Sequence, residues 1–227
     1  MERLQFLDSV RGILVILMIF FNYSFTLSYL DLFSLFPGNF IFWFLFPRFI
    51  ASSFIFLSGI TAFLSWKKYR KKFWKKCVKR FLKFFLIAFL ITIITYIYSN
   101  KDFVIFGIIH FFAFSSLLLP ILIFLKKWNI FSGFTFLIIG LIFNNFDYNN
   151  YFLVPFGIKP KNFSSMDYIP LFPWLSFLSF GIFFATILEK RIIKIKIKNT
   201  VLSIIGKNSF LIYLLHQPIL FLILSFV

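Results

Sequence analysis

An imidazole, an amide and a proline interrupt an apolar stretch near the carboxyl end of the chain. The stretch is SFLIYLLHQPILFLIL, and its polar members are Tyr213, His216 and Gln217, followed directly by Pro218. In a helix, Pro218 cannot donate to the carbonyl group one turn back, so that carbonyl needs another partner. Polar groups are costly in hydrocarbon and usually face a bundle interior or a cavity. Each side chain alone could serve packing, but the cluster favours a binding site.

The other of the chain's two histidines, His110, lies within the sequence DFVIFGIIHFFAFSS. At ~1.5 Å per helical residue, it would lie ~10 Å below the outer membrane surface. An imidazole at this depth could be a hydrogen-bonded packing residue. It could also be a general base, because imidazole exchanges a proton near neutral pH.

Polar residues at helical spacing also mark the amino-terminal apolar segment. Asp8, Arg11 and Asn22 share one helix face, and Asp8 and Arg11 can pair near the cytoplasmic end. Asn22 would lie ~16 Å deeper than Arg11, near the bilayer centre. Two interpretations remain open. The residues form an interfacial ion pair and an interhelical hydrogen bond, or they form a polar track from the cytoplasm to the membrane centre.

These residues need helices to position them, and the composition indicates that the helices span a membrane. Of 227 residues, 61% are hydrophobic and only 14% are charged, unlike an average soluble domain. We expect an all-α polytopic membrane protein in which residues 1–227 form a single integral-membrane domain. About seven runs approach the ~20 residues that a bilayer core of ~30 Å requires. The expected transmembrane helices are residues 10–30, 48–66, 81–99, 103–125, 128–144, 169–188 and 209–227.

The net charge of +17 lies mainly between the expected helices, which argues against nucleic-acid binding. With the amino terminus inside, the cytoplasmic segments hold 20 of the 24 Lys and Arg residues. The positive-inside rule therefore predicts a cytoplasmic amino terminus and an external carboxyl terminus in the plasma membrane. The single cysteine, Cys77, excludes an internal disulfide and a Cys-rich metal site, and we expect no metal.

Three connecting segments have unusual compositions. Residues 67–80, KKYRKKFWKKCVKR, could anchor the topology and attract anionic lipid headgroups, or could bind a phosphate-rich cofactor. Residues 193–198, IKIKIK, alternate with period two and predict a short strand or an interfacial segment. Residues 31–47 are apolar but contain prolines and glycine, so we expect a re-entrant or interfacial segment.

Two further polar residues have clear structural explanations. Ser58 lies in FLSG near mid-depth, where small residues let helices approach closely and a hydroxyl could also contact a ligand. Asp167 precedes the segment 169–188 and is expected to cap that helix.

Five segments, in order, resemble the heparan-alpha-glucosaminide N-acetyltransferase catalytic-domain family, and look like its small prokaryotic branch. They are RLQFLDSVRGILVILMIFFNY (3–23), FIFLSGITAFLS (54–65), FGIIHFFAFSSLLLP (106–120), DYIPLFPWLSFLSFGIFFA (167–185) and IGKNSFLIYLLHQPIL (205–220). The resemblance implies a transmembrane acyltransferase fold. It also implies transfer of an acyl group from cytoplasmic acyl-CoA, such as acetyl-CoA, to a hydroxyl or amine, often of a sugar or glycolipid-like acceptor.

The chain departs from the family pattern after the first apolar segment. Members with established activity carry a histidine there, and prokaryotic relatives often have one where this chain has Asn22. Residues 12–109 contain no histidine, although Asn22 matches the Asn-Tyr pair of the lysosomal members. Asparagine can orient a nucleophile or hold a carbonyl group, but it cannot take a proton at neutral pH. The catalytic residues expected from the resemblance are therefore His110, as the substitute base, and Asn22.

The leading hypothesis is an acyl-CoA-dependent membrane acyltransferase. Arg11 and the 67–80 segment would bind the phosphates of CoA, because Arg and Lys suit that role. The residues expected to contact the pantetheine or thioester are His216, Gln217 and Tyr213. The residues expected along the substrate path are Asp8, Ser58, Arg48 and Asp167.

Two other classes remain open. A small transporter or lipid-interacting membrane protein would use the polar track for a solute and the basic loops for membrane lipids. A degenerate homologue would bind acyl-CoA without catalysis. An enzyme should lose turnover and keep CoA binding when His110 is replaced, whereas a transporter should show no dependence on CoA.

Overall fold

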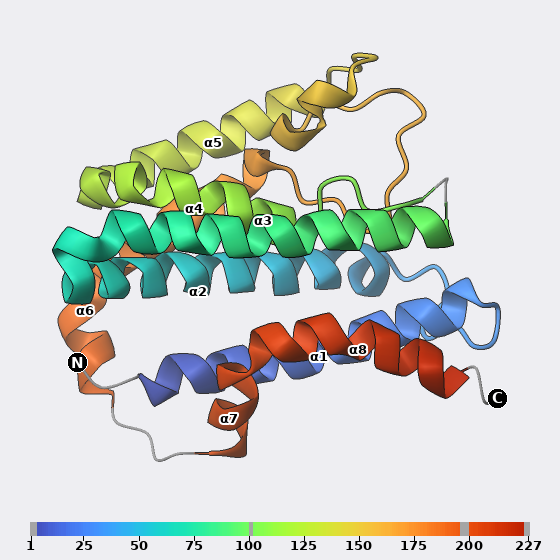
Figure 1. The fold of residues 1–227 in the computed structure, drawn as a ribbon, viewed down its shortest axis with the longest axis horizontal. Helices are drawn as coiled ribbons and strands as arrows, with labels where there is room; N and C mark the ends of the chain where they lie inside the picture. Colours follow the sequence, from blue (N-terminus) through green and yellow to red (C-terminus); the bar gives the residue numbers. More distant parts are fainter. Residues whose placement is uncertain (1–3, 100–101, 196–199, 225–227) are drawn as a thin grey trace. The chain divides into compact units, whose positions relative to one another are not determined.

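The computed structural model describes residues 4–99, 102–195 and 200–224, and these residues are mainly helical (Figure 1). The α-helices are α1 (Gln5–Tyr29), α2 (Phe46–Tyr69), α3 (Phe73–Tyr98), α4 (Ile108–Leu125), α5 (Asn129–Phe143), α6 (Leu171–Lys194), α7 (Val201–Lys207) and α8 (Ser209–Leu224). The short helical turns are η1 (Ile41–Leu45), η2 (Arg70–Lys72), η3 (Lys126–Trp128) and η4 (Tyr151–Phe156). Within the described residues, β-structure is limited to two isolated bridges, Phe106 with Tyr168 and Asp147 with Lys159.

The all-α membrane class is confirmed for the described residues. Four helical stretches are long and apolar enough to cross a membrane: Gln5–Tyr29, Ile41–Tyr98, Ile108–Phe143 and Leu171–Lys194. The second contains both α2 and α3, and the third contains both α4 and α5. In α8, Ser209–Leu220 is a shorter apolar helix. Within the described residues, each expected span falls mainly on a single helix, but the number of spans stays a prediction.

The structure describes all of segment 31–47 and part of segment 193–198, for which the sequence predicted unusual conformations. The expected re-entrant or interfacial segment contains turns followed by η1, a π-helix that continues directly into α2 at Phe46. Of the alternating segment 193–198, the first two residues end α6, and residues 196–198 lie outside the described part of the chain. The expected strand is therefore not tested.

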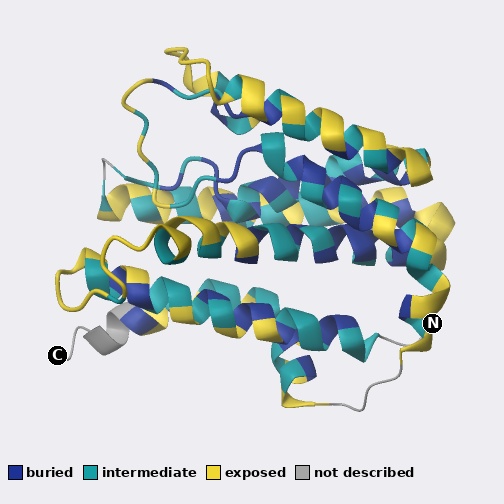
Figure 2. Ribbon diagram, turned by 180° about the vertical axis from the view of Figure 1, so that it is seen from behind, coloured by how far each residue is buried: buried dark blue, intermediate teal, exposed yellow. Residues whose placement is uncertain are grey.

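Many large apolar side chains of the described helices are exposed, and Figure 2 shows where exposed residues lie along the helices. On α3 alone, Leu86, Ile94 and Ile97 are more than half exposed. So many exposed large apolar side chains are unusual for a soluble monomer, and lipid chains cover such surfaces in a membrane. The exposure pattern therefore supports a membrane environment independently of hydropathy.

The chain divides into two compact units, each of which is described by itself. The first comprises residues 1–57 and 190–227, and the second comprises residues 58–189. In the first unit, α1 packs against α7 and α8. Gly12 and Gly206 allow this close approach, because a Cβ on Gly12 would meet the backbone of Leu202, and one on Gly206 would meet the backbone of Asp8.

In the second unit, α3 packs along α4, and α5 follows α4 after a tight turn. The turn is held by Asn129, which is fully buried and donates to the carbonyl groups of Leu122 and Lys126. Gly59 on α2 lies against the backbone of α6 at Leu178, where a Cβ would collide. Small residues thus allow close helix contacts in both units, as the sequence suggested for Ser58 and its neighbours.

Candidate functional site

A hydrogen-bonded pair joins the amino-terminal and carboxyl-terminal helices of the first unit. Asn22 Nδ2 on α1 lies 3.2 Å from His216 Nε2 on α8. His216 Nδ1 lies 2.6 Å from the carbonyl oxygen of Tyr213, one turn earlier. Because a carbonyl oxygen only accepts, Nδ1 carries the proton and Nε2 is the acceptor for Asn22. The pair therefore presents a neutral, fixed imidazole tautomer inside the unit, where His216 is only 6% exposed.

A second polar contact lies one turn farther along α1 and one residue farther along α8. The hydroxyl of Thr26 donates to the carbonyl of Asn22 at 3.0 Å and lies 3.5 Å from Gln217 Oε1. Tyr213 contributes its main-chain carbonyl to His216, and its ring lies 5.6 Å from the imidazole centroid. The structure therefore brings Asn22, which was predicted to be catalytic, beside Tyr213, His216 and Gln217, which were predicted together to bind the cofactor.

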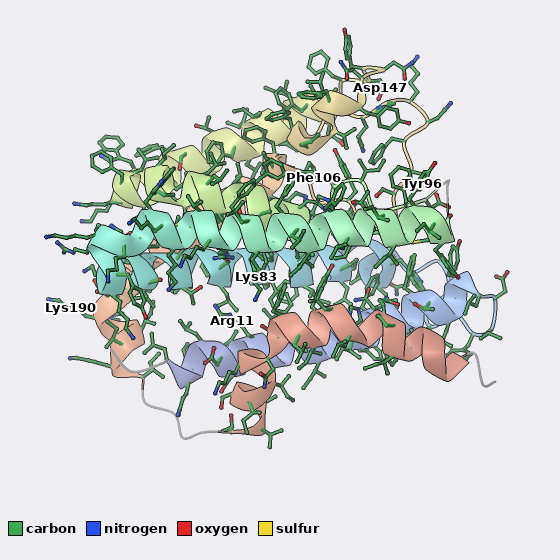
Figure 3. All side chains as sticks on the ribbon, viewed as in Figure 1. Arg11, Lys83, Tyr96, Phe106, Asp147 and Lys190 are labelled. Atoms are coloured by element: carbon green, nitrogen blue, oxygen red, sulfur yellow. The ribbon has the colours of Figure 1, made fainter. Side chains whose placement is uncertain are left out.

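The predicted pair at the start of α1 is present. Arg11 Nη1 lies 3.1 Å from Asp8 Oδ1, and the Asp8 side chain is almost fully buried (Figure 3 labels Arg11). The close approach of α7 at Gly206 covers the backbone of Asp8. These contacts thus fix the start of α1, whereas its cytoplasmic location and the assignment of Arg11 to a donor phosphate stay predictions.

His110, the expected base, lies in the second unit at the start of α4. The amide of Gly107 donates to its Nδ1 at 3.2 Å, and its Nε2 lies 3.2 Å from Thr92 Oγ1. The Thr92 hydroxyl donates its own proton to the carbonyl of Val104 at 2.8 Å, so Nε2–H donates to Thr92. Both ring nitrogens are therefore engaged in holding the start of α4, and a catalytic role for His110 stays a prediction.

Asp167 supplies a cap, but at a different helix from the one expected. Its Oδ2 accepts from the amide of Ile108 at 2.9 Å, at the first turn of α4. The bridge between Phe106 and Tyr168 places Asp167 there (Figure 3 labels Phe106), and a Cβ on Gly107 would meet its carboxylate. A carboxylate is favourable at a helix amino terminus, where backbone N–H groups lack partners. From its sequence position, Asp167 was predicted to cap α6, the next helix in the chain. The Phe106–Tyr168 bridge instead brings Asp167 to the first turn of α4.

The remaining predicted path residues make local contacts. Ser58 accepts from Arg80 Nη2 at 3.1 Å, within the second unit. Arg48 lies with its guanidinium 3.4 Å from the ring centroid of Phe44 and donates to the carbonyl of that residue at 2.9 Å. Asp8 and Arg48 lie in the first unit, whereas Ser58 and Asp167 lie in the second. A common substrate path through these four residues stays a prediction.

A pocket that sequence reasoning missed lies in the second unit, between α2, α3 and α4. It has a volume of about 210 Å³ and is lined by Thr61, Ala62, Ser65, Phe73, Lys76, Cys77, Arg80 and Leu119. The available signal was spacing: Thr61 and Ser65, and likewise Lys76 and Arg80, are four residues apart and share a helix face. Within the described residues, no group of three or more His, Cys, Asp or Glu side chains is close enough to hold a metal ion.

Comparison with known proteins identifies the family. No curated protein and no solved structure shows significant similarity to the chain. A family model described as heparan-alpha-glucosaminide N-acetyltransferase, catalytic, matches residues 3–218, which is almost the whole chain. The match includes both Asn22 and His216. The chain belongs to the heparan-alpha-glucosaminide N-acetyltransferase catalytic family.

Proposed function

We propose that this protein is a membrane-embedded acetyltransferase that moves an acetyl or other acyl group from cytoplasmic acyl-CoA to a hydroxyl or amine of a sugar-like acceptor. The observation that carries the proposal is the Asn22–His216 pair, found in a chain that its family model matches nearly throughout. Acyl transfer to a hydroxyl or amine needs a proton acceptor and a donor for the developing oxyanion. This pair contains both kinds of group.

We place the general base at His216. Its Nδ1–H is held by the Tyr213 carbonyl, which leaves the Nε2 lone pair as the only site for an incoming proton. A hydrogen bond at the far nitrogen also stabilises the imidazolium that forms, as in other catalytic histidines. The ring nitrogens of His110, by contrast, are both used to hold the start of α4.

Asn22 has two roles in this proposal. In the described arrangement, its amide donates to Nε2 and keeps the lone pair occupied. When an acceptor displaces that contact, the same amide becomes a donor for the thioester carbonyl oxygen. Gln217, one residue after His216 and beside Thr26, supports binding of the thioester arm.

The reaction then balances without a further reactant. The acceptor oxygen or nitrogen forms a bond to the thioester carbonyl carbon while its proton passes to His216 Nε2. The carbon–sulfur bond breaks, and the departing CoA thiolate receives that proton from the imidazolium. The products are an acetylated acceptor, the CoA thiol and the neutral histidine.

The membrane arrangement in this proposal has seven spans, formed by α1 to α6 and α8, with the amino terminus in the cytoplasm. The distribution of Lys and Arg between the helices supports that orientation. The cytoplasmic side then carries Arg11 and the 67–80 segment, which would attract the phosphates of CoA.

The test is transfer of labelled acetyl groups from acetyl-CoA by purified protein in proteoliposomes, against a panel of amino sugars and glycolipids. The proposal predicts labelled acceptor that depends on protein and on acceptor, above the rate of thioester hydrolysis. Binding of acetyl-CoA without transfer to any acceptor would favour the non-catalytic homologue. Absence of any acetyl-CoA binding by folded protein would favour the transporter or lipid-interacting class.

A further inference from the structure

The basic segment 67–80 carries nine Lys and Arg residues, but they do not have equivalent surroundings. Lys67 forms an ion pair with Glu189, and Arg70 lies over the ring of Trp66. Lys76 and Arg80, by contrast, line the pocket between α2, α3 and α4 that is described above. This pocket is called the α2–α3 pocket below. A topology anchor needs only positive charge near the membrane surface, so it does not explain why these two cations fold back against hydroxyl groups.

The two cations are held by hydroxyls from α2. Lys76 Nζ lies 2.7 Å from Ser65 Oγ, and Arg80 Nη2 lies 3.1 Å from Ser58 Oγ. A hydroxyl that accepts from a cation still has its own proton to donate. The guanidinium of Arg80 is also stacked 5.2 Å from the ring of Phe84, which orients its donors. These contacts hold several hydrogen-bond donors at fixed positions near one pocket.

The rest of the lining suits an anion with an apolar attachment. The eight lining residues include no acidic side chain, and four of them, Ala62, Phe73, Cys77 and Leu119, are buried. At about 30 Å³ per water molecule, a pocket of about 210 Å³ holds roughly seven waters, which is ample for a phosphate group. Lys supplies a point charge and Arg a planar fork, and both match phosphate oxygens.

We propose that the α2–α3 pocket is a phosphate-binding site, with Lys76, Arg80 and Ser65 as its ligand-contacting residues. The phosphate can be carried by the acyl-CoA donor or by an anionic phospholipid headgroup, and the donor alternative rests on the proposed function. Both ligands offer the same chemistry to the pocket, so the experiment must separate them.

The experiment measures ligand-induced thermal stabilisation of the full-length protein in phosphatidylcholine nanodiscs, since a ligand that binds the native state raises its apparent stability. The decisive variant is Lys76→Gln/Arg80→Gln. Its matched control is Lys190→Gln/Lys194→Gln, which removes the same charge at the same spacing from exposed positions outside both the pocket and the 67–80 segment. The probes are acetyl-CoA, the phosphate-free analogue S-acetylpantetheine, and nanodiscs that contain phosphatidylglycerol.

We expect the apparent Kd for acetyl-CoA to rise about tenfold or more in the pocket variant, because hydrogen bonds to charged groups contribute about this much to affinity. The control variant should change it less than about twofold, since its charges lie outside the pocket and act only through screened, long-range attraction. S-acetylpantetheine should bind both variants alike. Ser65→Ala, a milder change that keeps both charges, should raise the Kd about threefold and guards against a folding defect in the double variant.

The alternatives give different results. A phosphatidylglycerol effect that only the pocket variant loses, with no response to acetyl-CoA, would assign the phosphate to a lipid and keep the site. Equal losses in both double variants, or an unchanged Kd in the pocket variant and in Ser65→Ala, would overturn the site. Selective loss of phosphate binding in a protein that never transfers acetyl groups would overturn the proposed function and leave the pocket standing.

Discussion

Asn22 Nδ2 donates to His216 Nε2 across 3.2 Å, although 194 residues separate the two in the sequence. The contact joins α1 to α8 and fixes which imidazole nitrogen has a lone pair. It also links Asn22, a predicted catalytic residue, to the more buried of the chain's two histidines. The general base and the amide donor of the proposed mechanism therefore lie on adjacent helices of one compact unit.

Replacing Asn22 by Ala should lower kcat for acetyl transfer by about 10²-fold, because one donor to the developing oxyanion is lost. The KM for acetyl-CoA should change little, since the donor acts mainly on the transition state. Steady-state kinetics with labelled acetyl-CoA measure both constants. Thr26→Ala, one turn away, is the matched control and should keep kcat within a few-fold. A rise in KM alone for Asn22→Ala would place this residue in substrate binding.

Replacing Gly206 or Gly12 by Ala should destabilise the protein, because the new methyl group would meet backbone atoms of the neighbouring helix. Overpacking of this kind costs about 2 kcal/mol of the free energy of unfolding. Denaturant unfolding in detergent, followed by helix content, measures the effect. Ile13→Ala, on the exposed face of the same helix α1, should change stability by less than about 0.5 kcal/mol. Equal stability of all three variants would mean that α1 and α7 do not pack closely.

Replacing Asp167 by Ala should reduce the free energy of unfolding by about 1 kcal/mol, because the Ile108 amide loses its acceptor. The acetyl-transfer rate per folded molecule should stay unchanged, since the residue holds a helix end. Thermal unfolding and transfer assays on the same preparation separate the two effects. A large loss of rate at full stability would instead support the predicted role of Asp167 on the substrate path.

Tyr168 lies between the candidate spans, and its hydroxyl donates to the Val154 carbonyl at 2.8 Å. Burial raises the pKa of this phenol above its ordinary value. The native state therefore holds the proton more tightly than the unfolded state, so stability from this group is complete below about pH 10 and declines as pH rises above it. Tyr168→Phe should cost about 1 kcal/mol at neutral pH. The variant should also lose less stability than the parent between pH 9 and 11, and parallel pH profiles would contradict this account.

The sequence predicted the helices well, because long apolar runs and the period of the polar residues are local signals. The Asp8–Arg11 ion pair is such a case, because a spacing of three residues on one helix is enough to bring the two side chains together. The Asn22–His216 contact could not be predicted as a pair, because nothing local specifies which helices become neighbours. The same limit explains Asp167, which a chain reversal brings to α4, and the pocket residues Ser65 and Lys76, which only the α2–α3 turn brings together.

The most direct test of the central claim compares acetyl transfer by His216→Gln and His110→Gln, with acetyl-CoA binding measured alongside. Glutamine keeps hydrogen-bonding capacity but cannot serve as a base. The account predicts that His216→Gln lowers kcat by about 10²-fold to 10⁴-fold while acetyl-CoA still stabilises the protein. It also predicts that His110→Gln keeps its rate per folded molecule. Full turnover by His216→Gln together with loss of turnover in His110→Gln would contradict the account and place the base at the start of α4.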